Sequence, residues 1–197
     1  MLAVGAGAER MTQAMRSLEA LFLIGIEGVT EIWLVRHGDC YESMSDGDDP
    51  PLSPLGRKQA ARLAERVRRL NPAAVYASPY RRALETARAI SDDVNVEPRL
   101  VEMAMDLTDE GMLDFKEAPA AVVERMSAAL NQMAEEHPGQ RVIVVSHGAA
   151  IVNYLTDLLR LEPGQLRLLP YYTSVSIVKA LGDRRVVAGF GDVSHLE

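Results

Sequence analysis

The chain has 197 residues, 48% of them hydrophobic, and a formal net charge of −7. A chain of this length can bury a core of ordinary size, and no linker divides it, so one main domain is expected. The acidic balance argues against a nucleic-acid partner or an anionic membrane surface, because both depend on clustered Lys and Arg. The single cysteine, Cys40, excludes an internal disulfide and fits a reducing compartment, which predicts a cytoplasmic protein.

Residues 1–28 are predicted to form an N-terminal extension ahead of a domain at residues 29–197. A helix is expected over residues 9–23, because apolar side chains recur there at helical spacing: Met11, Met15, Leu18 and Phe22. Its apolar face could cover the domain's own core or a second subunit, so a homodimer is left open. The alternative is that residues 1–28 are partly disordered or precede the true start. The apolar stretch 20–26 is too short to span a bilayer, so no membrane association is expected.

The chain after this extension opens with a strand that ends in reactive side chains. Ile32 to Val35 is an uncharged apolar run, which predicts a strand buried on both faces. Arg36 and His37 follow where this strand stops, and Gly38 allows a tight turn. An imidazole beside a fixed positive charge would then lie at the carboxyl end of a strand, where sites form in parallel sheets.

The next segments predict a loop, a helix, a strand and a second helix. Residues 39–51 are acidic and rich in turn formers, so a loop is expected there. Ser53-Pro54 predicts the start of a helix reaching Leu70, whose basic side we interpret as a solvated face. A short strand at 73–76 is followed by Ser78-Pro79, read as a second cap and first-turn proline. The helix after it would begin at a strand end, where its first-turn amides favour an anion and either Arg81 or Arg82 can face inward.

The second half repeats the strand, histidine, glycine arrangement. Residues 94–118 predict an irregular insertion or lid after a short strand at 94–96, and Pro119 opens a helix that ends near His137. The run 141–145 is the clearest buried strand, and Ser146-His147-Gly148 follows it ahead of a helix at 149–159. A hairpin is expected for Val175 to Ala180 and Arg185 to Phe190, turning at Gly182-Asp183.

Three strand ends therefore carry polar groups that suit an anion. The alternation of strands and helices predicts an α/β three-layer sandwich with a mostly parallel central sheet and helices on both faces. The groups at its strand ends are Arg36 with His37, Ser78 with Arg82, and Ser146 with His147. Two imidazoles, two guanidiniums and a helix N-terminus would bind a phosphoryl group, since guanidinium matches phosphate oxygens bidentately. Unrelated capping and core residues are the alternative reading, and two histidines without a spaced third ligand do not predict a zinc site.

Ordered motifs across residues 31–196 resemble the histidine phosphatase superfamily, which has the phosphoglycerate-mutase-like fold. They are Leu34-Val35-Arg36-His37-Gly38, Pro51-Leu52-Ser53-Pro54-Leu55-Gly56, the stretch from Val75 through Arg82 to Ala87, Val144-Val145-Ser146-His147-Gly148, and the tail Gly191-Asp192-Val193-Ser194-His195-Leu196. The resemblance implies that His37 is the phosphorylated nucleophile. It implies that Arg36, Arg82 and His147 hold the phosphoryl oxygens.

The same resemblance implies that Glu102 is the acid. The glycine- and tryptophan-containing stretch that commonly follows this glutamate is absent, so Asp106, Asp109 or Glu110 could hold the role instead.

The expected function is that of a phosphomonoesterase that hydrolyses small phosphorylated substrates through a phosphohistidine, without a metal or cofactor. Phosphoglycerate mutase-type phosphotransfer is the first alternative. It is disfavoured because the basic residues usual in the loop after the first histidine are replaced by Glu42, Asp46, Asp48 and Asp49. A phosphate-binding scaffold with little turnover is the second alternative.

Overall fold

The computed structural model describes residues 3–40, 49–162, 165 and 167–197, and the side chains of 3–8 and 107 are not described. Its centre is a six-stranded sheet in the order β3-β2-β6-β1-β7-β8. Four strands run parallel, namely β1 (Thr30–Arg36), β2 (Ala74–Ala77), β3 (Asn95–Val96) and β6 (Arg141–Ser146). β7 (Val175–Leu181) pairs antiparallel with β1, and β8 (Arg184–Asp192) pairs antiparallel with β7. The mostly parallel sheet is the predicted one.

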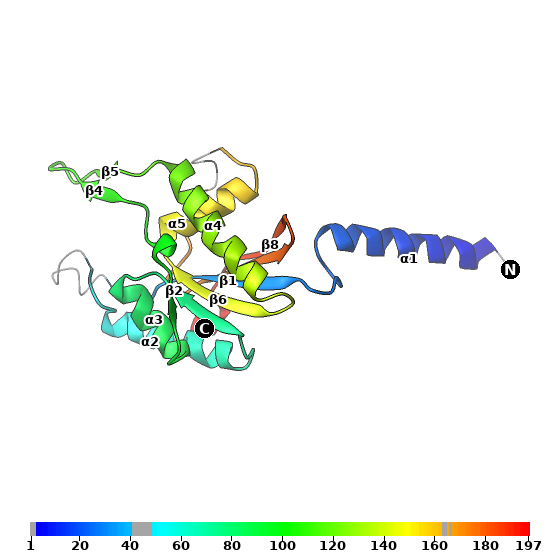
Figure 1. Ribbon diagram of the computed structural model, residues 1–197, viewed down its shortest axis with the longest axis horizontal. Helices are drawn as coiled ribbons and strands as arrows, with labels where there is room; N and C mark the ends of the chain where they lie inside the picture. Colours follow the sequence, from blue (N-terminus) through cyan, green and yellow to red (C-terminus); the bar gives the residue numbers. More distant parts are fainter. Residues whose placement is uncertain (1–2, 41–48, 163–164, 166) are drawn as a thin grey trace.

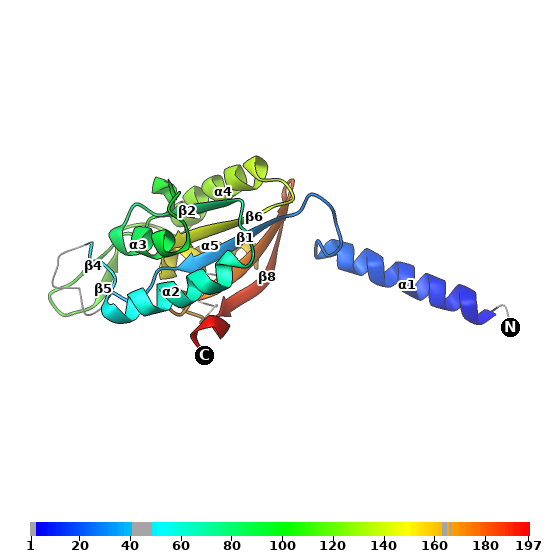
Figure 2. The same cartoon turned by 90° about the horizontal axis from the view of Figure 1, so that it is seen from below.

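Helices cover both faces of this sheet, as Figures 1 and 2 show. α2 (Pro54–Arg68) and α3 (Arg81–Ile90) lie on one face, and α4 (Pro119–Glu136) and α5 (Gly148–Leu158) lie on the other. Along β1, Ile32 and Leu34 join the core under α4 and α5, whereas Trp33 and Val35 join the core under α2 and α3. This alternation explains why β1 is an unbroken apolar run, because both of its faces are buried.

The sheet order brings the two histidine-bearing strand ends together. β1 and β6 are direct neighbours in parallel register, with Arg36 opposite Ser146. β2 flanks β6 on its other side, with Ala77 opposite Val145. The segments that follow these three strands therefore leave the same edge of the sheet, as the sequence predicted.

The helix starts agree with the sequence in one case and differ in another. Ser53 is the N-cap of α2, and its side chain accepts a hydrogen bond from the Gly56 amide. Ser78, in contrast, does not cap α3: the N-cap is Tyr80, which makes no side-chain capping bond, and the helix begins at Arg81. The prediction for Ser78 was wrong because its hydroxyl contacts His147 instead.

The predicted insertion at 94–118 contains regular structure. It holds β3, a 3₁₀ turn at Pro98–Leu100 and a hairpin of β4 (Met105–Leu107) and β5 (Leu113–Phe115). The hairpin projects from the domain beside the site edge of the sheet (Figure 1), and the side chains of β5 are exposed. The predicted β7–β8 hairpin forms as well, with Gly182 at its turn in a positive-φ conformation.

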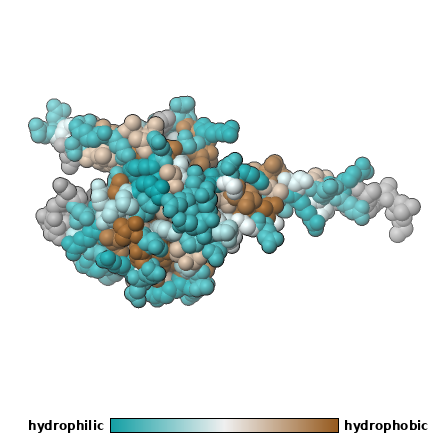
Figure 3. Space-filling model, in the orientation of Figure 1, coloured by the Kyte–Doolittle hydropathy of each residue, from teal (hydrophilic) through white to brown (hydrophobic). Residues whose placement is uncertain are grey.

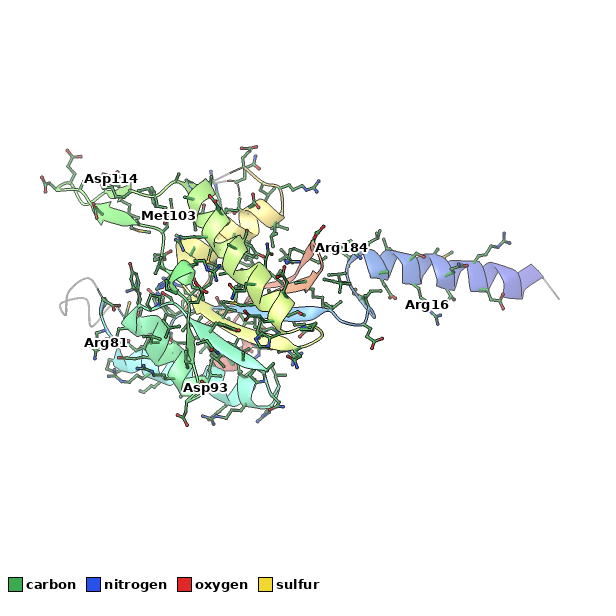
Figure 4. The ribbon with its side chains drawn as sticks, in the orientation of Figure 1. Arg16, Arg81, Asp93, Met103, Asp114 and Arg184 are labelled. Atoms are coloured by element: carbon green, nitrogen blue, oxygen red, sulfur yellow. The ribbon has the colours of Figure 1, made fainter. Side chains whose placement is uncertain are left out.

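The N-terminal helix is longer than predicted and projects away from the sheet. α1 spans Ala3–Leu21, and Figure 1 shows it extending from the side opposite the site. Its large apolar side chains are about half exposed or more, including Met11 at 66% and Leu18 at 49%. Of the alternatives left open for this face, the structure does not show docking of its described side chains on the domain's own core. Arg184 of β8 instead donates to the carbonyls of Ala20 and Leu21, and apolar side chains gather at this junction (Figures 3 and 4).

No helix in the described ranges is both long and apolar enough to cross a membrane.

Candidate active site

His37 is fixed at the end of β1 by a tight backbone junction. The Gly38 amide donates to Thr86 Oγ1 of α3 at 3.0 Å, and the Asp39 amide donates to Gln59 Oε1 of α2 at 2.8 Å. Gly56 lets the two segments touch, because a Cβ on it would lie only 2.0 Å from the Asp39 carbonyl oxygen. The sequence Gly38-Asp39 is thus held between α2 and α3, so the His37 backbone has little freedom.

The His37 ring is buried and has one nitrogen already engaged. It is 4% exposed, and its Nδ1 lies 2.7 Å from the Gly38 carbonyl oxygen. Because a carbonyl only accepts, Nδ1 carries the proton and Nε2 keeps its lone pair. Burial lowers the pKa of His37 to about 3. The hydrogen bond to Gly38 acts in the opposite direction, and the charges of Arg82 and Arg36 lower the pKa further. The imidazole is therefore neutral at ordinary pH, with Nε2 as its nucleophilic atom.

Arg82 faces inward, and Arg81 faces solvent. Arg82 Nε lies 3.3 Å from His37 Nε2, and the Arg82 side chain is only 12% exposed. Arg81 is 58% exposed and pairs with Glu85. The α3 amide expected to attract an anion is occupied by a carboxylate of the protein: Arg81 N donates to both oxygens of Asp49, at 2.8 and 3.0 Å. Asp49 Oδ1 also lies 3.6 Å from Nη1 of Arg82, so this carboxylate is next to a guanidinium that is a candidate for binding a phosphoryl group.

His147 lies beside His37 with a ring-centroid separation of 5.1 Å. It is fully buried, which together with the surrounding positive charges lowers its pKa well below the ordinary value. Its Nε2 lies 2.8 Å from Ser78 Oγ, whereas its buried Nδ1 has no hydrogen-bond partner among the described residues. The Tyr80 ring meets the His147 ring edge-on at 5.1 Å. His147 is thus a neutral imidazole with one ring nitrogen engaged.

The Arg36 guanidinium is enclosed by a segment that the sequence did not single out. It lies 4.0 Å above the Tyr172 ring, and its Nη1 donates to the Pro170 carbonyl at 2.8 Å. Gly148 leaves room for it, since a Cβ there would stand 3.4 Å from Arg36 Nε. That buried Nε has no partner among the described residues. The Tyr172 ring also lies 5.8 Å from the His37 ring, which places it at the site.

Glu102 reaches the site as a cap on the first turn of α5. Its Oε1 accepts from the amides of Met103 and Ala150, both at 2.9 Å, and its Oε2 accepts from Ala149 at 3.3 Å. Because α5 starts directly after His147, these bonds to Ala149 and Ala150 bring the carboxylate, although distant in sequence, to the helix turn that follows the second histidine. Oε2 has only one long contact, so it is the oxygen better able to exchange a proton with a ligand.

The alternative acids lie on the exposed hairpin. Asp106 is 70% exposed on β4 and faces Lys116 at 3.8 Å, and Asp109 and Glu110 are exposed in the turn. Figure 4 shows the neighbouring strand, labelled at Asp114, at the far tip of the molecule. None of the three shares the α5 cap with Glu102. The loop residues Glu42, Asp46 and Asp48 lie outside the described residues.

The structure brings the predicted groups together at the adjacent carboxyl ends of β1, β6 and β2. Arg36, His37, Arg82 and His147 are connected by the contacts above, with Glu102 adjoining them. Thr86 and Tyr172 were missed, and Asp49 was named only as one of the loop acids, without its contacts to Arg81 and Arg82. A hydroxyl within a helix, one acid among several in a loop, and a tyrosine in an irregular segment give no pattern that would identify them.

Two guanidiniums and a neutral imidazole suit attack on a phosphoryl group, since the charge of its oxygens is balanced while the nucleophile stays unprotonated. No cluster of His, Cys, Asp or Glu able to hold a metal ion occurs among the described residues.

Comparison with known proteins agrees with this reading. The profile of the histidine phosphatase superfamily (branch 1) matches residues 32–116 and 106–193. A metal-independent phosphoserine phosphatase of Arabidopsis thaliana is 31% identical, over 85% of this chain and 84% of its own. A probable phosphoglycerate mutase GpmB of Cronobacter sakazakii is 29% identical, over 85% and 95%. The solved structure of Bacillus stearothermophilus YhfR superposes with a TM-score of 0.73 at 25% identity, over 85% of this chain and all of that one.

Proposed function

As a member of the histidine phosphatase superfamily the chain is a phosphoryl-transfer enzyme, and we propose that it hydrolyses small phosphomonoesters through a phosphohistidine on His37. One observation carries the proposal. His37 Nδ1 donates to the Gly38 carbonyl, so the lone pair of the ring is on Nε2, where it accepts a hydrogen bond from Arg82 Nε at 3.3 Å. A nucleophile beside a phosphate-binding cation is what phosphoryl transfer requires.

In the first step His37 Nε2 attacks phosphorus. The N–P bond forms as the bond from phosphorus to the ester oxygen breaks, and the leaving oxygen takes a proton from Glu102 Oε2. The charge on the transferring oxygens is balanced by Arg36 and Arg82. His147 helps to hold the phosphoryl oxygens through Nδ1, because its Nε2 already forms a hydrogen bond with Ser78.

In the second step water attacks the phosphohistidine. Glu102, now ionised, takes a proton from the water as the new P–O bond forms and the N–P bond breaks. Inorganic phosphate leaves, and His37 returns to its neutral form with Nε2 unprotonated. The proposal assigns no metal and no cofactor, because two guanidiniums already supply positive charge around the phosphoryl group.

Hydrolysis is proposed ahead of mutase chemistry because of the charge beside Arg82. A mutase must hold a second anionic group of its substrate while the phosphoryl group moves. The Asp49 carboxylate, 3.6 Å from Arg82 Nη1, opposes binding of such a group on that side. Mutase activity stays the second candidate, since relatives such as that of Cronobacter sakazakii are described as probable phosphoglycerate mutases. A binding module with little turnover is the third.

A turnover assay separates these candidates. Purified protein is given phosphoserine, 3-phosphoglycerate and nitrophenyl phosphate, and release of inorganic phosphate is measured beside conversion of 3-phosphoglycerate to 2-phosphoglycerate. The proposal predicts phosphate release that disappears in His37→Ala. Isomerisation faster than phosphate release would favour the mutase, and slow turnover of every ester in a broad panel would favour the binding module.

We also propose a cytoplasmic location, since a single buried cysteine suits a reducing compartment. A homodimer stays a prediction, which light scattering on the purified full chain would test.

A further inference from the structure

The segment that contacts Arg36 is unusual in its backbone. Thr173 follows Tyr172 and has a φ of +57°, a left-handed conformation that a β-branched residue rarely adopts. Such conformations persist only where the surroundings over-determine them, and they concentrate at functional sites. The strained residue here directly follows the tyrosine whose ring covers a phosphoryl-binding arginine.

Several hydrogen bonds hold this turn against the active-site strand. The Thr173 amide donates to the carbonyl oxygens of Arg36 at 3.0 Å and of His37 at 3.3 Å. The Ser174 amide donates to the Tyr171 carbonyl at 3.0 Å, and the Arg36 amide donates to the Ser174 carbonyl at 3.3 Å. The turn is therefore hydrogen-bonded to the backbone of Arg36 and His37.

The C-terminal tail supports the same turn from behind. Thr173 Oγ1 donates to the Tyr172 carbonyl at 2.7 Å and lies 3.0 Å from His195 Nε2. Because the Thr173 hydroxyl hydrogen is used, His195 Nε2 must carry the proton of this second bond. The tail is itself fastened to α2, where Arg66 pairs with Asp192 at 2.5 Å and Arg62 donates to the Leu196 carbonyl.

We infer that Tyr172 is a positioning residue for Arg36, presented by the strained Thr173 turn and supported by His195. The inference rests on the proposed role of Arg36 in binding the phosphoryl group. A guanidinium over an aromatic face keeps its in-plane N–H donors directed sideways, so stacking orients it without consuming those donors. The Pro170 carbonyl takes one N–H on one side, and Gly148 lies against Nε on the other, where a Cβ would stand 3.4 Å from it. Tyr172 thereby fixes the direction in which Arg36 meets a phosphoryl oxygen.

The first test compares Tyr172→Phe, which keeps the aromatic face, with Tyr172→Leu, which removes it. Tyr171→Leu is the matched control, since Tyr171 is 55% exposed and its ring packs on Tyr172 rather than on Arg36. The readouts are the inhibition constant of inorganic phosphate, kcat and KM for nitrophenyl phosphate, and the melting temperature. Tyr172→Leu should weaken phosphate binding about 3- to 30-fold, whereas Tyr172→Phe and the control should stay within about 2-fold.

Combination with Arg36→Ala separates positioning from a purely structural effect. If Tyr172 acts through Arg36, Tyr172→Leu adds no further loss of phosphate binding in the Arg36→Ala protein. An equal loss in both backgrounds would overturn the inference, and so would unchanged phosphate binding in Tyr172→Leu alone. If Arg36→Ala itself bound phosphate normally, the proposed role of Arg36 would fail and the inference with it. Normal binding in Tyr172→Leu beside weak binding in Arg36→Ala would remove the inference only.

His195 gives a second route that does not depend on the folding of Tyr172→Leu. His195→Gln places an amide N–H near the position of Nε2, whereas His195→Ala removes the donor. We expect His195→Gln to keep phosphate affinity within about 3-fold and His195→Ala to lower it by more, in the direction of Tyr172→Leu. Equal affinities in the two His195 variants would contradict support of the turn by the tail.

Discussion

Two single side chains carry the proposed chemistry of this site, His37 and Glu102. His37 is neutral because it is buried between two cationic groups, and its Nδ1 proton is fixed by the Gly38 carbonyl. Both carboxylate oxygens of Glu102 accept hydrogen bonds from backbone amides, those of Met103 and of the first turn of α5, so it stabilises the start of the helix that follows His147. These two residues carry the nucleophilic and proton-transfer parts of the proposed reaction.

Glu102→Gln should separate substrates by their leaving groups. A positioned general acid is typically worth ~10²–10⁴-fold, and it matters most where the leaving oxygen is strongly basic. We expect phosphohistidine formation to slow strongly with alkyl phosphates such as phosphoserine and much less with nitrophenyl phosphate. The measurement is single-turnover rapid quench, so that the later hydrolysis step does not mask the difference.

Equal losses on the two substrates would mean that Glu102 serves only to cap α5. No loss on either would transfer the role to Asp106, Asp109 or Glu110. Asp106→Asn is the matched control, because Asp106 lies exposed on β4 and its loss should leave both rates unchanged.

Residues at strand ends could be predicted from sequence, and residues that reach the site from irregular segments could not. Arg36, His37 and His147 follow buried apolar runs, and parallel strands place such residues at one edge. Tyr172 lies in a stretch without periodicity. Thr173 has a positive φ, whereas a β-branched residue normally favours an extended backbone with negative φ. Ser78 was misread as a cap because Ser-Pro is also a common helix start, and nothing in its neighbourhood reveals a partner 69 residues away.

At the scale of elements, the first turn of α3 carries Arg82, the proposed phosphate-binding side chain, and is also capped from another segment. Asp49 accepts from the Arg81 amide and lies 3.6 Å from Arg82 Nη1, so one carboxylate both stabilises the helix start and pairs with the guanidinium proposed to bind phosphate. The start of α3 therefore depends on a residue that precedes α2 in the chain.

Asp49→Asn and Asp49→Ala should affect stability and binding differently. Asparagine keeps an acceptor for the Arg81 amide, whereas alanine loses the cap, which typically costs ~1 kcal/mol. Both variants remove the negative charge, so inorganic phosphate should inhibit both more strongly than the unmodified protein. Urea unfolding and phosphate inhibition are the measurements. Unchanged phosphate affinity in both variants would show that Asp49 does not compete for Arg82.

Removal of residues 1–28 tests the proposed division between extension and domain. α1 contacts the domain through its last turn, where Arg184 binds two carbonyls, and Leu23 beyond it is 2% exposed. The truncated protein should keep kcat/KM within about 2-fold, because no site residue precedes Arg36, and its melting temperature should fall with the loss of buried Leu23. A folded but inactive truncation would show that the extension contributes to the site.

For the molecule as a whole, buried neutral histidines couple stability to pH. The pKa of His37 falls to about 3 and that of His195 to about 4, in both cases chiefly through burial, and the pKa of His147 is lowered in the same direction. In the unfolded chain these groups titrate near 6.5. Between pH 6.5 and about 3 the unfolded state therefore binds more protons than the folded state, so the folded state loses stability as pH falls.

Urea unfolding at pH 7.0, 6.0, 5.0 and 4.5 should accordingly give a free energy of unfolding that declines below pH 6.5. His195→Gln should decline less steeply, since it removes one of the titrating groups. A free energy that stays constant from pH 7.0 to 4.5 would be incompatible with neutral, buried histidines in the folded protein.

The central claim is that His37 Nε2 accepts the phosphoryl group. The most direct measurement is rapid quench of the full chain with ³²P-labelled substrate, followed by peptide mapping of the label. The account predicts a label on His37 that is lost in acid and retained in base, as expected for a phosphoramidate, and that is absent from His37→Ala. Turnover at the ordinary rate in His37→Ala, or a label mapped to another residue, would contradict it.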